Sequence, residues 1–167
     1  MLPIPATDPA GFLWFLIFTA PIAIWVAWSD MKSMKIPNQA VLALAGVWLV
    51  AGYFLQPTNI WLWGFALLAI VLVVGFLLTT FAGVGAGDSK YAAAMAPFFT
   101  GADIRTVMAL FAACILGAFA CHRIARALPA VRAATPDWAS WTHHKFPMGL
   151  ALSGTLIFYP VLAAILP

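Results

Sequence analysis

The sequence contains no glutamate among its 167 residues, and only 8% of its residues are charged. Soluble domains carry about a quarter charged residues, so this scarcity excludes an ordinary soluble protein. Hydrophobic residues make up 65% of the chain, which predicts an integral membrane protein embedded in the lipid bilayer. A spanning helix uses about 20 residues, so several such helices leave no room for a separate soluble domain. We expect residues 1–167 to form one domain, an all-α bundle.

The chain also has few cysteines and few basic residues. Cys114 and Cys121 form no CxxC pair, so neither a zinc site nor a disulfide framework is expected. No Lys or Arg precedes the first apolar stretch and no small-residue cleavage pattern follows it, so we expect no removable signal peptide. The formal net charge is +3, but Lys and Arg in a membrane protein usually set its topology. Nucleic acid is therefore not an expected partner.

Long apolar segments are what the sequence has in abundance. We delimit six of them: 11–29, 39–55, 60–82, 89–100, 104–128 and 146–166. All but the fourth are long enough to span a bilayer. As a helix, the fourth rises about 1.5 Å per residue and covers little more than half of a hydrocarbon core about 30 Å thick. This segment either crosses the membrane within a bundle of about six transmembrane helices or folds back.

The distribution of Lys and Arg decides between these two topologies, because both residues collect in cytoplasmic loops. If all six segments cross, seven of the eight basic residues lie on one side and only Arg105 lies opposite. If the fourth folds back, four lie on each side. We therefore predict six crossings with both termini outside. The segments expected in the cytoplasm are 30–38, 83–90 and 123–145.

Tryptophans are numerous for a chain of this length, and their positions suggest two roles. Six lie near predicted helix ends, where an interfacial aromatic belt is expected: Trp14, Trp28, Trp61, Trp63, Trp138 and Trp141. Trp25 and Trp48 are instead expected inside the bundle.

Asp30 ends the first apolar segment, where the helix dipole disfavours a carboxylate. Pro37 disfavours helical structure at Ile36, so the helix should end there, and Asn38 can cap the next helix. The plainer interpretation is an interfacial turn with an incidental acid and lysines that extend toward the headgroups. A functional role for Asp30 would instead need a second residue as its partner.

A second acid lies in the stretch "GVGAGDSK", residues 83–90. No strand precedes it, the Walker spacing is absent, and an acid would repel phosphate, so it is not a nucleotide-binding loop. Gly85 and Gly87 let the backbone leave helical geometry, which at membrane depth is tolerated only beside protein or a water-filled cavity. Asp88 then opens the short fourth helix beside such a cavity. Alternatively, Asp88 only caps that helix and Lys90 anchors it.

The predicted topology brings Asp30 and Asp88 to the same membrane face. Two carboxylates about 3 Å apart cannot both ionise readily at neutral pH, so they share a proton. One carboxylate can take a proton from a water that attacks a peptide carbonyl, while its protonated partner stabilises the developing oxyanion. Because such a pair titrates as a unit, neither residue is assigned a fixed role.

These residues resemble the type IV prepilin peptidases, members of the GxGD class of intramembrane aspartyl proteases. The GxGD motif is present as Gly85-Ala86-Gly87-Asp88, and Lys90 follows it as in the family. The family's first aspartate precedes an Ile-Pro-Asn turn, which matches Asp30 with Ile36, Pro37 and Asn38. A weaker match in "KFPMGLALSG" involves Pro147, Gly149 and Gly154. The resemblance implies that Asp30 and Asp88 are catalytic and that the other motif residues support them.

The resemblance also implies a substrate and a location. Prepilins, which have a short basic leader and an apolar helix, would be cut at the cytoplasmic face of the prokaryotic inner membrane. Larger members carry an N-terminal region with two CxxC pairs and also methylate the new N-terminus. This chain starts almost directly with its first helix and has no CxxC pair, so it looks like the short, peptidase-only form that serves tight-adherence (Flp-type) pili. We expect no methyltransferase activity and no cofactor, S-adenosylmethionine included.

Two other functions remain open at this point. Paired acids also mark ion pathways, as in a small proton-coupled transporter or channel, although that function favours acids near mid-membrane and matching halves. A structural subunit of a pilus assembly platform would need neither acid. The adjacent His143 and His144 have no third ligand in the sequence, so no metal is predicted.

Overall fold

The computed structural model describes residues 9–165, which form helices and loops with no strand in that range. The helices are α1 (Pro9–Ser33), α2 (Asn38–Leu55), α3 (Thr58–Ala82), α4 (Ala86–Met95), the 3-10 helix η1 (Ala96–Phe99), α5 (Ile104–Ala127), α6 (Pro129–Ala134), the 3-10 helix η2 (Ala139–Trp141) and α7 (Met148–Ile165). Within the described residues, α2, α3, α5, α7 and the Leu13–Ser33 part of α1 are long and apolar enough to cross a membrane. The expected all-α membrane protein is confirmed.

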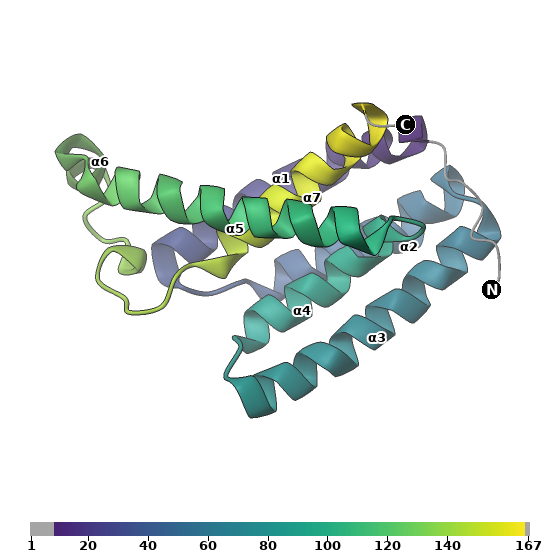
Figure 1. Cartoon of the computed structure of the whole chain (residues 1–167), viewed down its shortest axis with the longest axis horizontal. Helices are drawn as coiled ribbons and strands as arrows, with labels where there is room; N and C mark the ends of the chain where they lie inside the picture. The colour runs from purple at the N-terminus through teal and green to yellow at the C-terminus, as the bar shows by residue number, and fades with distance from the viewer. Residues whose placement is uncertain (1–8, 166–167) are drawn as a thin grey trace.

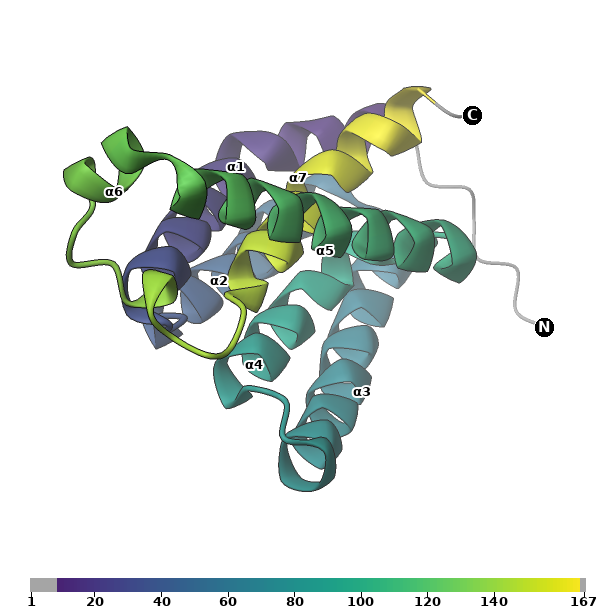
Figure 2. The same ribbon diagram turned by 60° about the vertical axis from the view of Figure 1, so that its left-hand side comes forward.

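The long helices run back and forth between the two ends of the bundle (Figure 1). α1 and α7 lie antiparallel and form the most extensive helix pair, and α5 packs on the other side of α7. Figure 2 shows α3 and α4 running together away from α5. One end of the bundle therefore holds the loops before α2, before α4 and before α7, and this end carries the candidate site.

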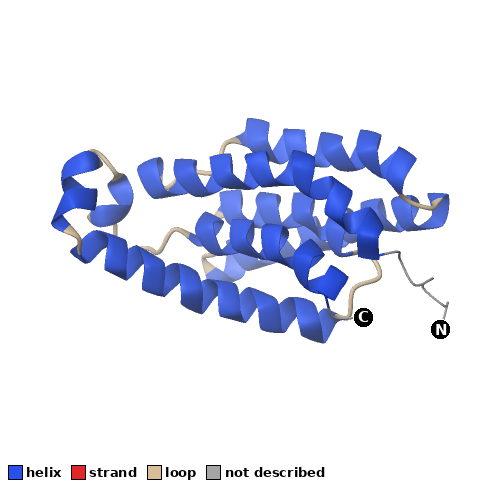
Figure 3. Ribbon diagram, turned by 90° about the horizontal axis from the view of Figure 1, so that it is seen from above, coloured by secondary structure: helices blue, strands red, loops and turns tan. Residues whose placement is uncertain are grey.

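α4 is a short helix that lies inside the protein. It packs against α2, α3 and α7, and most of its second half is buried. Its sequence "AGDSKYAAAM" is rich in small residues, which let the surrounding helices approach closely. α4 and η1 together lead from the end that holds the candidate site to the end where α5 begins (Figure 1). Figure 3 shows that the described part of the chain consists of helices joined by loops. Because neighbouring helices surround α4, this short helix needs no apolar surface that faces lipid.

The core centres on Trp48 of α2, whose side chain is fully buried. Its ring lies 5.7 Å from that of Phe15 and 5.3 Å from that of Phe98. The indole N–H of Trp48 donates to the carbonyl of Trp61, and the indole N–H of Trp61 donates to the carbonyl of Trp48, each over 3.2 Å. Trp48 is therefore a bundle residue as expected. The same expectation is wrong for Trp25, which is 42% exposed on the outer side of α1.

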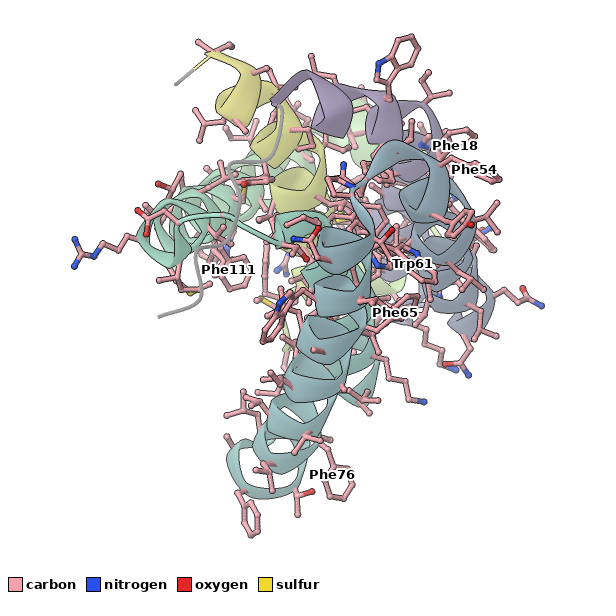
Figure 4. The ribbon with its side chains drawn as sticks, turned by 90° about the vertical axis from the view of Figure 1, so that its right-hand side faces the viewer. Phe18, Phe54, Trp61, Phe65, Phe76 and Phe111 are labelled. Atoms are coloured by element: carbon pink, nitrogen blue, oxygen red, sulfur yellow. The ribbon has the colours of Figure 1, made fainter. Side chains whose placement is uncertain are left out.

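α3 presents most of its apolar side chains to the outside. Phe81 is 83% exposed and Phe76 is 68% exposed. Figure 4 shows Phe76 near the end of α3 that projects from the rest of the bundle, whereas Trp61 and Phe65 lie beside the other helices. In a bilayer these exposed side chains contact lipid, which is as apolar as they are.

Candidate functional site

Asp30 lies in the last turn of α1 and is only 5% exposed. Its Oδ2 accepts a hydrogen bond of 2.7 Å from the backbone N–H of Gly149, the second residue of α7. The N-terminus of a helix presents free N–H groups and the positive end of its dipole, so α7 provides what a carboxylate at the end of α1 lacks. A Cβ atom added to Gly149 would lie 2.9 Å from that Oδ2, so only glycine allows the two helices to come this close.

Asp88 is the third residue of α4, and Gly85 occupies the N-cap position without a side-chain hydrogen bond. Asp88 therefore does not occupy the N-cap position, as the alternative interpretation of this residue required. A Cβ on Gly85 would collide with Oδ2 of Asp88. Gly83 ends α3 with a φ of 69°, a left-handed conformation that glycine adopts without strain. The glycines thus allow the chain to turn sharply and bring its backbone against the acid.

The turn between α1 and α2 connects the two acidic segments. A Cβ on Gly87 would lie 3.4 Å from Cβ of Ile36, so the first turn of α4 packs against this turn. The N-cap of α2 is Pro37, with no side-chain hydrogen bond, and Asn38 is the first helical residue. The expectation that Asn38 caps α2 is wrong, because Pro37 holds the N-cap position and Asn38 is already part of the helix.

Asp30 and Asp88 line the same cavity of about 610 Å³. Of the other residues singled out from the sequence, those that line it are Ile36, Asn38, Gly85, Gly87 and Lys90. Gly149 takes part through its hydrogen bond to Asp30. Pro37 and Pro147 form the starts of α2 and α7 without lining the cavity. The structure thus brings together segments that are far apart in the sequence.

The remaining acids lie elsewhere. Asp103 is the N-cap of α5, where its side chain accepts a hydrogen bond from the backbone N–H of Arg105. Asp137 is exposed in the loop before α7. Asp8 lies outside the described residues. Asp30 and Asp88 are the only carboxylates among the residues that line the cavity in the described part of the chain.

The surroundings of Asp88 favour its protonated form. Burial, followed by the nearby charge of Asp30, raises the pKa of Asp88 from its ordinary value of 3.8 to about 6, while Lys145 acts in the opposite direction. Burial and a like charge both disfavour an ionised carboxylate. Asp88 and Asp30 are therefore close enough to interact, and one of the pair can hold a proton not far below neutral pH.

Sequence reasoning missed the contribution of the loop before α7. His143, His144 and Lys145 line the cavity. From the sequence, Lys145 was counted only among the basic residues that set the topology, and His143 and His144 were considered only as metal ligands. The available signal was the position of Lys145 just ahead of the Pro147–Gly149 motif. Among residues 9–165, no group of three or more His, Cys, Asp or Glu side chains is placed to hold a metal ion.

Comparison with known proteins gives one family match. The model of the type IV leader peptidase family matches residues 16–122, more than half of the chain. This region includes both acidic segments and ends before the start of α7. No curated protein and no solved structure was found to match the chain.

Proposed function

Because the chain belongs to the type IV leader peptidase family, we propose that this membrane peptidase uses Asp30 and Asp88 as an aspartic dyad. Membership of this family implies that the substrates are prepilins. We propose that they belong to the tight-adherence (Flp-type) class. The observation that carries the proposal is the shared cavity, in which the two carboxylates interact and the pKa of Asp88 is raised to about 6. A pair with one proton has both a base and an acid available.

The proposed reaction is the addition of water to one peptide bond. One carboxylate takes a proton from a water molecule, whose oxygen attacks the carbonyl carbon at the end of the leader. The protonated partner stabilises the oxyanion that forms. When the tetrahedral intermediate collapses, the C–N bond breaks and the amine leaves with a proton returned by the pair. The Gly149 N–H holds Asp30 in place throughout, and the pair acts as a unit.

Cavity and substrate fit each other in polarity. The cavity lies at an end of the bundle and is lined by Lys35, Asn38 and Lys90 in addition to the acids, so it suits water and an extended peptide. The apolar helix of a prepilin would lie in the bilayer while its leader enters the cavity. From the distribution of Lys and Arg, we propose that this end faces the cytoplasm and that the termini lie outside.

We propose that the protein removes the leader without methylating the new N-terminus. Hydrolysis by a carboxylate pair consumes water alone, so the mechanism needs no metal and no S-adenosylmethionine. Cys114 and Cys121 form no CxxC pair of the kind found in methylating relatives.

The test is cleavage of the host's tagged Flp-type prepilin, co-expressed with the wild-type protein, Asp30→Asn or Asp88→Asn. Asn keeps the shape of the side chain and removes the proton chemistry, so each variant should abolish the mobility shift of the cleaved pilin. The matched control is Asp137→Asn, because Asp137 is exposed and does not line the cavity. Membrane abundance of each variant is measured alongside. Cleavage that persists in both dyad variants would contradict the proposal.

A further inference from the structure

A second cavity of about 360 Å³ lies next to the site, between the end of α5 and the loop before α7. We call it the basic pocket and define it by its polar residues with positive or titratable side chains: His122, Arg123, Arg126, His143, His144 and Lys145. No carboxylate is among its lining residues in the described part of the chain. The pocket therefore has the charge of an anion-binding site and no internal counter-ion.

His122 gives the pocket an unsatisfied polar atom. The residue is only 6% exposed, and its Nε2 is buried without a hydrogen-bond partner. Its ring stacks on Trp141 with centroids 5.4 Å apart and donates a hydrogen bond to the backbone carbonyl of Ser140. The ring is thus fixed in orientation. A buried polar atom without a partner costs about 1–3 kcal/mol. Because the other ring nitrogen donates to Ser140, the neutral ring presents Nε2 as an acceptor, and a headgroup hydroxyl can donate a hydrogen bond to it.

We propose that the basic pocket binds the phosphate group of an anionic phospholipid. Arg123 and Arg126 offer the forked donors that suit phosphate oxygens. Lys145 adds a third charge, so the pocket favours a headgroup with net negative charge over one whose phosphate is neutralised internally. Basic pockets between membrane helices bind such headgroups on the cytoplasmic side.

The location favours a lipid over free phosphate. Counted from Ile104, about 20 helical residues cross a hydrocarbon core of about 30 Å and reach Arg123. Arg123 and Arg126 therefore lie at the depth of the headgroups. Leu116 and Phe119 are exposed one to two turns deeper on α5, where acyl chains would contact them. The pocket and the adjoining helix match the two parts of a phospholipid.

Lys145 also lines the cavity of Asp30 and Asp88. A phosphate held in the basic pocket would thus lie beside the candidate site and would draw this lysine toward itself. The proposal does not depend on peptide cleavage, because lipid binding is measured directly.

The test is native mass spectrometry of the full chain, purified in detergent and incubated with phosphatidylglycerol or phosphatidylcholine. Wild-type protein should retain phosphatidylglycerol preferentially. The double variant Arg123→Gln/Arg126→Gln should bind it at least about tenfold more weakly, since it loses hydrogen bonds to a charged group. The matched control is Arg105→Gln/Arg132→Gln, which removes the same charge from exposed positions outside the pocket and should bind as the wild type does.

Inorganic phosphate is the third ligand, added in excess as a competitor. Failure of phosphate to displace the lipid supports the proposal, whereas full displacement assigns the pocket to free phosphate and overturns it. Equal retention of both lipids, or undiminished retention by Arg123→Gln/Arg126→Gln, also overturns it. Thermal unfolding of each variant is compared first. If the double variant is unfolded, Arg126→Gln alone provides the comparison, with a smaller loss in the same direction.

Discussion

At the scale of single residues, the contact between Gly149 and Asp30 decides the geometry of the site. The hydrogen bond of 2.7 Å from the Gly149 N–H joins the start of α7 to the end of α1. A Cβ atom at position 149 would lie 2.9 Å from Oδ2 and 3.0 Å from Cβ of Asp30, which is too close for either contact to be accommodated without a shift. The glycine is needed because the backbone itself is the partner of the carboxylate.

Gly149→Ala should therefore displace the Asp30 carboxylate and reduce prepilin cleavage by about 100-fold, the effect of misplacing a catalytic group by about 1 Å. The measurement is the initial rate of cleavage by purified protein. Gly117→Ala in α5 is the control, because nothing lies within 4 Å of its Cβ position. Equal rates for the two variants would show that the hydrogen bond to Asp30 does not position it for catalysis.

The pKa of Asp88 predicts how cleavage depends on pH. With a pKa of about 6, raised by burial and by Asp30, Asp88 holds a proton below that pH and loses it above. The singly protonated pair should thus disappear, and the cleavage rate should fall, as the pH rises through about 6. Lys145 lowers this pKa, so Lys145→Gln should raise it and move the falling limb to higher pH.

The pH profile is measured with a peptide that lacks titratable groups near the cleaved bond. Lys32→Gln is the control, because Lys32 is exposed and does not line the cavity. A falling limb that does not move in Lys145→Gln, or that moves equally in both variants, would contradict the assignment of Lys145.

At the scale of helices, α2 and α3 are joined by Trp48 and Trp61, each of which donates its indole N–H to the backbone of the other. Glycine makes this joint possible, since a Cβ on Gly64 would overlap the Trp48 ring. Trp48 in turn packs against Phe98 of η1. Because η1 continues α4, the joint helps to fix the helix that carries Asp88.

Gly64→Ala should destabilise the protein by about 1–3 kcal/mol, the usual cost of overpacking a core. The free energy of unfolding is measured in mixed detergent micelles with increasing denaturing detergent. Gly46→Ala is the control, because nothing lies within 4 Å of its Cβ position. Alanine also has a higher helix propensity than glycine, so this variant should not be destabilised. If both variants are as stable as the wild type, the Trp48–Trp61 joint is looser than its geometry indicates.

The helices also show how far sequence reasoning reaches. The apolar segments and the spacing of Asp30, Pro37 and Gly85–Asp88 predicted helices and a candidate pair of acids, because both are local patterns. The burial of α4 was not predictable from its own length, since α2, α3 and α7 enclose it. The place of Lys145 depends likewise on packing between distant segments. The same limit explains Trp141, which was expected at the interface but is buried against His122.

For the whole molecule, the direction of each helix has a consequence for its orientation in the membrane. Residues of the α1–α2 turn, the start of α4 and the loop before α7 line one cavity, so these segments belong on the same side. From the distribution of Lys and Arg, we propose that this side faces the cytoplasm. α4 and η1 must then carry the chain across, although α4 is not itself long enough to span the bilayer.

Labelling with a membrane-impermeant maleimide in intact cells tests this orientation. In a background of Cys114→Ser/Cys121→Ser, the single variants are Lys32→Cys, Arg132→Cys and Arg105→Cys, all at exposed positions. Arg105→Cys should be labelled from outside, and the other two only after permeabilisation. Each variant must still cleave prepilin, so that the labelled protein is the active one. Opposite accessibility of Lys32→Cys and Arg132→Cys would mean that α4 folds back, and labelling of both from outside would place the candidate site on the external face.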